Sequence, residues 1–145
     1  KGLAGHVFRR FAVDAAEGIF GSPRYSRECR AVTGAVIAVE KAKFAQVGGF
    51  DEGIAVSGGD VEWCLRHAPY QRSVVCLANL GIVHHESLSR GASSVPASDI
   101  AAELKAYQSL LLNGDPYFHP ALSTASTCAL PWLDGETAKQ RAARF

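Results

Sequence analysis

The sequence lacks several features that would assign it to a familiar class of protein. Its 145 residues carry 15 lysines and arginines against 14 aspartates and glutamates, so neither sign of charge dominates. Domains that bind nucleic acid rely on a dense surplus of positive charge, and we therefore expect no nucleic-acid partner. The four cysteines include no Cys-x-x-Cys pair, which argues against a tetrahedral zinc site built on thiolates.

Long hydrophobic runs are also missing. The longest apolar stretch, residues 31–39, is interrupted by Thr33 and Gly34 and is far too short to cross a bilayer. Residues 1–13 have no apolar core of the kind that a signal peptide needs. We therefore expect reduced thiols and a cytoplasmic protein.

Hydrophobic patterning predicts strands and helices that alternate within one domain. Residues 29–39 are rich in β-branched side chains and are expected to form a buried strand, and residues 73–77 and 80–84 are expected to form shorter strands. Such alternation is typical of the α/β class, in which helices cover a sheet.

Three segments between and after these strands have helical patterns. Residues 40–47 are rich in helix formers, and Gly48 is suited to end that helix. Asp60 is expected to be the N-cap of a second helix, in which Trp63 or Cys64 packs inward. Residues 98–112 predict an amphipathic helix. Its apolar stripe would consist of Ile100, Leu104, Tyr107 and Leu111.

Asp60 is the strongest candidate for chemistry. An aspartate at this place has two readings, a helix cap that satisfies free amides or a general base at the mouth of a cleft. Gly58 and Gly59 would let a substrate approach the backbone closely. Glu62 lies two residues further on and cannot share the helix face of Asp60, so it is a secondary candidate.

His84 and His85 are the second candidate group. They end a predicted strand, so their side chains point to opposite faces and at most one can serve a site. Such a histidine is either structural or a metal ligand. Arg90, beside a glycine, is either a phosphate contact or a solvated loop residue. The His-His-Glu run is not the His-Glu-x-x-His of zinc proteases, which leaves a metal-dependent hydrolase as a poor alternative.

Read in order, four blocks of the sequence resemble the C-terminal half of family 2 glycosyltransferase domains, of the type found in O-antigen and other surface-polysaccharide assembly proteins. These blocks are AVTGAVIAVEKAKFAQVGGFDE, GGDVEWCLR, VHHESLSRG and LLLNGDPYFHPALS. The resemblance covers residues 1–123 approximately and leaves residues 124–145 as a C-terminal tail. It implies a partial GT-A fold, a Rossmann-like α/β arrangement that contains the acceptor-side half and lacks the N-terminal nucleotide-binding part.

The resemblance also implies a reaction and roles for individual residues. Such enzymes transfer a sugar from a nucleotide-sugar donor to a glycan acceptor with inversion at the anomeric carbon. Asp60 matches the general base, and His84 matches a ligand to Mg²⁺ or Mn²⁺. The positions implied to bind or shape the substrates are Thr33, Gly34, Asp51, Glu52, Gly59, Glu62, Ser89 and Arg90.

The sequence departs from the family pattern in ways that limit this reading. Gly59 stands where the family usually has Glu or Asn, and Glu62 stands where it usually has Asp. The Asp-x-Asp motif that shares the metal is not present in these 145 residues. We therefore expect the isolated chain to be inactive, as a fragment or half-domain completed by a missing N-terminal half or by a partner subunit.

Two further expectations follow from an incomplete domain. A sheet without its first half has a bare edge, which predicts self-association through that edge. Polysaccharide enzymes of this type work in the cytoplasm or at the inner face of the membrane. The alternative function is a non-catalytic carbohydrate-binding or assembly half-domain derived from the same fold.

Overall fold

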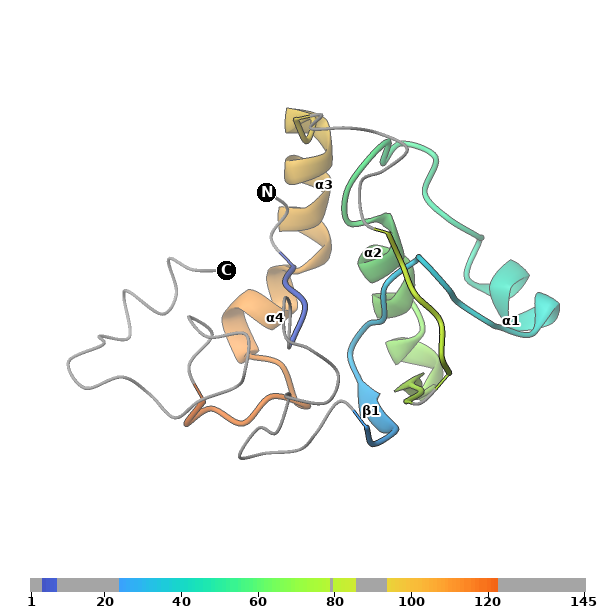
Figure 1. The fold of residues 1–145 in the computed structure, drawn as a ribbon. Coiled ribbons are helices and arrows are strands. Elements are labelled where there is room, and N and C mark those ends of the chain that lie inside the picture. Colours follow the sequence, from blue (N-terminus) through green and yellow to red (C-terminus); the bar gives the residue numbers. More distant parts are fainter. Residues whose placement is uncertain (1–3, 8–23, 79, 86–93, 123–145) are drawn as a thin grey trace.

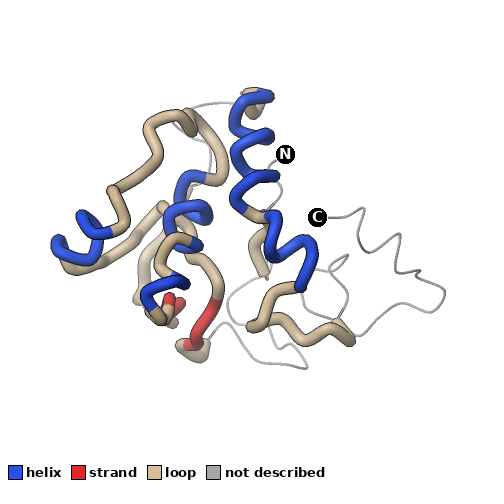
Figure 2. The backbone as a smooth tube through the Cα atoms, turned by 180° about the vertical axis from the view of Figure 1, so that it is seen from behind, coloured by secondary structure: helices blue, strands red, loops and turns tan. Residues whose placement is uncertain are grey.

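The computed structural model describes residues 4–7, 24–78, 80–85 and 94–122 (Figure 1). Within these residues there are two short strands and several short helices. In Figures 1 and 2, α2 lies between α1 and the pair formed by α3 and α4. The elements in chain order are β1 (Arg27–Cys29), α1 (Lys41–Gln46), α2 (Gly59–Leu65), the 3₁₀ turn η1 (Ala68–Tyr70), β2 (Val74–Cys76), α3 (Ala97–Ala106) and α4 (Gln108–Asn113).

The sheet of the described residues has two antiparallel strands. Cys29 of β1 pairs with Val74 of β2, and Arg27 pairs with Cys76. The strand predicted over residues 73–77 is therefore confirmed. The partial GT-A fold implied by the resemblance stays a prediction, because two strands and a few helices are compatible with many folds.

Two predicted strands are wrong within the described residues. Only Cys29, at the start of the segment 29–39, belongs to a strand, and the chain then turns at Gly34 and Ala35. Residues 80–85 form no strand, and apolar side chains such as Ile82 and Val83 are exposed. A β-rich sequence forms a strand only where a neighbouring backbone supplies hydrogen-bond partners, and no third strand is described here. Self-association through the sheet edge stays a prediction.

The end of α1 follows local rules. As predicted, the helix over residues 40–47 ends at Gly48, which has φ +83°. The N–H of Gly48 donates to the carbonyl of Ala45 at 3.0 Å, and the N–H of Gly49 donates to that of Phe44 at 3.1 Å. This pair of bonds is the Schellman arrangement, which only a left-handed residue permits without strain.

Arg66 joins the end of α1 to the end of α2. Its guanidinium donates to the carbonyl of Val47 and, at 2.6 Å, to that of Gly49. The same group forms an ion pair with Glu62, one turn earlier on α2. The carbonyls at the C-terminal end of α1 therefore bind the Arg66 side chain at the end of α2, which fixes the two helices relative to each other.

The core is small and centres on α2. Its buried apolar residues are Val47, Trp63 and Cys64, which confirms that α2 packs this face inward. The Trp63 ring lies 5.8 Å from the ring of Phe44 and 5.5 Å from that of Phe50. These aromatic contacts attach α1 and the turn after it to α2.

The predicted helix over residues 98–112 differs from the structure in two ways. It is broken at Tyr107 into α3 and α4. Its buried face also carries Asp99 and Glu103, whereas Leu104 is 47% exposed. Tyr107 is the one member of the predicted stripe that is fully buried. Asp99 and Glu103 lie on the buried face because both carboxylates accept hydrogen bonds from the loop before α2.

No helix within the described ranges has the length and apolar character needed to cross a membrane.

The pKa of His67 predicts that acid destabilises the fold. His67 is buried against Trp63, with ring centroids 4.6 Å apart. Burial lowers its pKa, and the positive charges of Arg72, Arg66 and Lys43 lower it further. At pH values between this lowered pKa and the pKa near 6.5 of an unfolded histidine, the unfolded chain binds a proton at His67 and the folded chain does not. Stability is therefore complete above about pH 7 and falls as the pH drops below about 6.5.

Urea unfolding between pH 5.5 and 8 measures this effect. The unfolding midpoint is expected to decrease on acidification, and His67→Gln should flatten that decrease. His6→Gln changes an exposed histidine that has no hydrogen bond within the described residues, and it is the matched control that should leave the decrease unchanged. An equally steep decrease in the His67 variant would contradict the assignment.

Candidate functional site

Asp60 lies in the first turn of α2 and is not the N-cap, which corrects the sequence prediction. The cap position belongs to Gly58, with φ +84°, and the helix begins at Gly59. The two carboxylate oxygens of Asp60 each accept one amide. Oδ1 accepts the N–H of Val61 at 2.9 Å, and Oδ2 accepts the N–H of Gly34 at 2.6 Å. Asp60 therefore holds its own helix end and also a distant loop.

Gly34, of the Thr33–Gly34 pair, lies against Asp60. A Cβ atom on Gly34 would be 3.1 Å from Cβ and 3.3 Å from Oδ2 of Asp60, so the approach is close. Thr33 Oγ1 accepts the N–H of Ala35 at 3.4 Å, which supports the turn. Both Thr33 and Gly34 are exposed, whereas Asp60 is half-buried. The structure thus brings together residues that are 26 positions apart.

The acidic residues of the Gly-Gly-Phe-Asp-Glu block lie in an exposed turn. Asp51 Oδ1 accepts the N–H of Gly53 at 2.8 Å, and the carbonyl of Asp51 accepts the N–H of Ile54 at 3.1 Å. Glu52 is exposed beside it. Ile54 then reaches Gly59, whose added Cβ would be 3.7 Å from Ile54 Cγ2. The turn is therefore connected to the start of α2 through an apolar contact.

Glu62 is bound to Arg66. Its Oε2 accepts Arg66 Nη2 at 2.9 Å, and its Oε1 is 2.8 Å from Arg66 Nε. The side chain of Glu62 is 15% exposed in this two-point pair. A planar guanidinium that binds a carboxylate at two points fixes the orientation of that carboxylate. Any contact of Glu62 with a substrate would have to use the remaining lone pairs.

The structure does not connect the candidate metal ligand to Asp60. His84 and His85 are both exposed at the end of the segment 80–85, which forms neither helix nor strand. No hydrogen bond joins either histidine to Asp60, and the described part of the chain contains no group of three side chains suited to hold a metal ion. Ser89 and Arg90 lie outside the described residues. The roles of these four residues stay predictions.

Asp99 of α3 is a residue of this site that sequence reasoning missed. It is completely buried and accepts three consecutive backbone amides of the loop before α2. The amides of Val56 and Ser57 donate to its Oδ2 at 2.7 and 2.9 Å, and that of Ala55 donates to Oδ1 at 3.2 Å. The bond from Ser57 lowers the pKa of Asp99, and the other two amides lower it as well against the opposing effect of burial.

Glu103, one turn further along α3, is the second such residue. It is 1% exposed, and its Oε1 accepts the Ser57 hydroxyl at 2.7 Å. Its side chain also packs directly against Gly58, where an added Cβ would be 2.5 Å from Glu103 Cγ. The spacing of four between Asp99 and Glu103 was visible in the sequence and places them on one helix face. The sequence contained no indication that this face, and not the leucine face, is buried.

Tyr107 extends the same face toward Asp60. Its hydroxyl is buried and has no hydrogen-bond partner in the described ranges. Burial raises the pKa of Tyr107, and the negative charges of Glu103, Asp60 and Glu62 raise it further. These charges act on one phenol because α3 packs against α2 here. Tyr107 therefore stays protonated at neutral pH.

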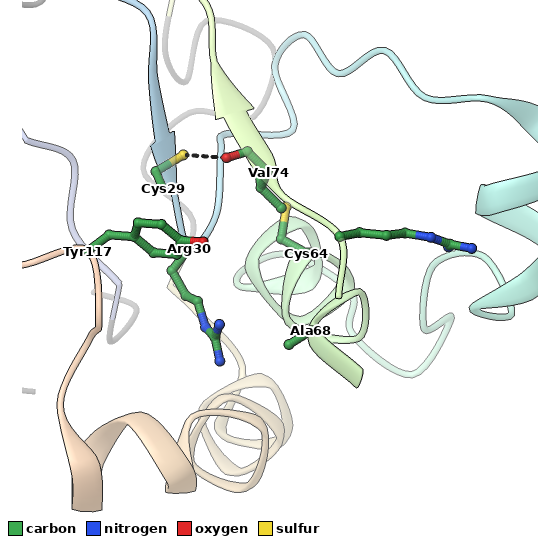
Figure 3. A pocket seen from close by; sticks show the side chains of 7 residues that line it. Cys29, Arg30, Cys64, Ala68, Val74 and Tyr117 are labelled. Atoms are coloured by element: carbon green, nitrogen blue, oxygen red, sulfur yellow. Dashed lines mark hydrogen bonds between the residues drawn. The ribbon is translucent and has the colours of Figure 1, made fainter. Parts of the chain in front are cut away.

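A separate small pocket lies where β1 and β2 meet the C-terminal end of α2 (Figure 3). Cys29 and Cys64 line it, and the thiol of Cys29 is 3.8 Å from the carbonyl of Val74. Burial raises the pKa of both thiols, so they stay protonated and unreactive at neutral pH. The cysteines among the described residues are free.

Comparison with known proteins identifies a relative in polysaccharide assembly. The chain is 39% identical over 131 residues to the O-antigen biosynthesis protein RfbC of Myxococcus xanthus. The alignment covers 89% of this chain and 10% of that protein, so the chain spans about a tenth of the length of the curated relative it matches. No family model and no solved structure matches the chain.

Proposed function

We propose that this chain is the acceptor-side part of an inverting glycosyltransferase of polysaccharide biosynthesis. One observation carries the proposal, which is the 39% identity to a protein named for O-antigen biosynthesis along 89% of the chain. The position of Asp60 adds support, because it is half-buried beside an exposed turn and next to glycines. The family 2 assignment and the GT-A fold are part of the proposal and rest on the sequence resemblance.

In the proposed reaction Asp60 is the general base. A carboxylate has about four lone-pair sites, and the amides of Gly34 and Val61 use one on each oxygen. The others can accept the proton of an acceptor hydroxyl within about 2.6–3.2 Å. As that proton moves to Asp60, the hydroxyl oxygen attacks the anomeric carbon of the donor sugar. The bond from this carbon to the nucleoside diphosphate breaks, and the configuration inverts.

The other residues of the resemblance are proposed to hold the two substrates. Gly34, whose amide donates to Asp60, and its neighbour Thr33 would contact the reacting sugar, together with Gly59, which precedes Asp60 in the chain. The exposed turn with Asp51 and Glu52 would shape the acceptor side. Ser89 and Arg90 are proposed to contact the donor phosphates, and Glu62 to assist through the lone pairs that Arg66 leaves free.

The proposed metal needs ligands beyond those described. Mg²⁺ or Mn²⁺ would neutralise the departing diphosphate when bound. His84 is exposed and alone, and the described residues do not assemble a ligand set by themselves. The proposal therefore assigns the remaining ligands to an Asp-x-Asp motif outside these 145 residues, in another segment or in a partner chain. The enzyme is proposed to act in the cytoplasm or at the inner face of the membrane.

Calorimetric titration with UDP, GDP and dTDP, with and without Mn²⁺, tests the proposal. The complete gene product is expected to bind one of these nucleotides at micromolar strength only when Mn²⁺ is present. The 145-residue chain alone is expected to bind none, because the donor-binding part lies elsewhere. If the complete gene product binds no nucleotide but binds a glycan, the non-catalytic alternative replaces the proposal.

A further inference from the structure

We propose that Asp99 and Glu103 form a clamp that positions Asp60 for catalysis. The clamp consists of these two α3 carboxylates and the loop over residues 55–58 that they hold. The inference rests on the proposed function, in which Asp60 is the general base. It assigns a role to two residues that do not themselves contact the substrates.

The bonds of Asp99 define the path of the loop. Three successive N–H groups converge on one carboxylate, at distances between 2.7 and 3.2 Å. A loop backbone held at three consecutive residues has little freedom to shift. The carboxylate is completely buried, so water cannot take over as acceptor if the loop moves.

Glu103 fixes the next point of the chain. It accepts the Ser57 hydroxyl at 2.7 Å and fills the space beside Gly58, which is in the left-handed conformation. Only glycine fits there, because a Cβ would meet the Glu103 side chain at 2.5 Å. The last two loop residues before α2 are therefore both held by Glu103, Ser57 through a hydrogen bond and Gly58 through packing.

Only one residue separates the end of this loop, Gly58, from Asp60. The carbonyl of Gly58 accepts the N–H of Glu62 at 2.8 Å, which is the first hydrogen bond of α2. Asp60 lies inside that first turn and reaches across to Gly34 at 2.6 Å. A shift of Ser57 or Gly58 must therefore move Asp60 relative to the Gly34 turn. A misplacement of about 1 Å at a reacting group costs up to about 10²-fold in rate.

The chemistry of the clamp explains why this helix face is acidic. Apolar side chains would bury comparable area at less cost, since a carboxylate is expensive to remove from water. They would, however, leave the amides of residues 55–57 without acceptors inside the protein. Two buried carboxylates are therefore suited to a helix face whose main requirement is to hold a loop in one position.

Amide exchange of Gly34, followed by NMR on the 145-residue chain, tests the clamp without any activity. Asp99→Asn keeps the shape but turns an NH₂ group toward amide donors. The Gly34 amide is expected to exchange about tenfold faster in this variant, as in Asp60→Ala, which removes its acceptor. Glu40→Gln changes an exposed residue paired with Lys43 and is the control that should leave the exchange rate unchanged. If Asp99→Asn does not fold, Ser57→Ala, which removes only the Glu103 contact, should raise the rate severalfold.

Turnover of the complete gene product supplies the second readout. Asp99→Asn is expected to lower kcat by about 10–100-fold and to change the KM for the nucleotide sugar little, because the clamp acts on the base. A lower melting temperature with unchanged Gly34 exchange and unchanged kcat would overturn the clamp. If Asp99→Asn speeds the exchange of the Gly34 amide but the complete gene product turns over no nucleotide sugar, the proposed function fails and the structural clamp stands.

Discussion

Replacing Asp60 by asparagine is expected to lower the turnover of the complete gene product by about 10²–10⁴-fold. In the proposed reaction the amide cannot take a proton from the acceptor hydroxyl, so the attacking oxygen would lose its general base. Donor binding should change little, because the proposed donor contacts come from other residues. Release of the nucleoside diphosphate gives the turnover, and calorimetric titration of the same variant gives the donor affinity.

The structure indicates what else this variant changes. An asparagine has one carbonyl oxygen and can keep the hydrogen bond to Gly34 or to Val61, but not both. A thermal unfolding curve is therefore needed beside the kinetics, with Glu40→Gln as the control for removal of an exposed carboxylate. Near-normal turnover in a folded Asp60→Asn variant would remove Asp60 from the role of base.

Replacing Gly58 by alanine is expected to reduce the free energy of unfolding by about 2–5 kcal/mol. Two costs add at this residue. The left-handed backbone, with φ +84°, disfavours any residue with a Cβ by about 1–2 kcal/mol. The new methyl group would also lie 2.5 Å from Cγ and 2.6 Å from Oε1 of Glu103, and overpacking of this kind costs about 1–3 kcal/mol. Urea unfolding at pH 7.5 measures the sum.

Gly81→Ala separates the two costs. Gly81 has φ +63°, yet no atom of the described residues lies within 4 Å of its added Cβ, so this variant should lose only the backbone part. Combining Gly58→Ala with Glu103→Ala removes the atoms that clash, and the double variant should lose less stability than the sum of the single variants. Equal losses for Gly58→Ala and Gly81→Ala would show that Glu103 does not press on the loop.

Local elements were predictable where neighbouring residues decide them. The helix before Gly48 and the strand over residues 73–77 follow from composition and from one glycine, and both are confirmed. The position of Asp60 at the start of α2 was predicted to within two residues, although the cap itself is Gly58. A cap requires a residue with non-helical backbone, and the left-handed backbone at this position, with φ +84°, favours glycine.

The strands predicted over residues 29–39 and 80–84 fail for a different reason. Both segments have strand composition, but residues 30–39 contain the turn that places Gly34 against Asp60, and residues 80–85 pair with no described strand. Side-chain type can favour a strand, whereas hydrogen bonds to a second backbone make one. The same composition would allow both segments to pair if another strand were supplied.

The sequence by itself determined the candidate base, the glycines beside it and the helices that carry them, because these depend on contacts within a few residues. Only the tertiary structure decided which face of α3 is buried. From the periodicity of this helix alone, the apolar stripe with its leucines is the face expected to pack inward. Asp99 and Glu103 become the better buried face only when amides and a hydroxyl from 42 to 46 residues away converge on them, because an accepted hydrogen bond offsets the cost of removing a carboxylate from water.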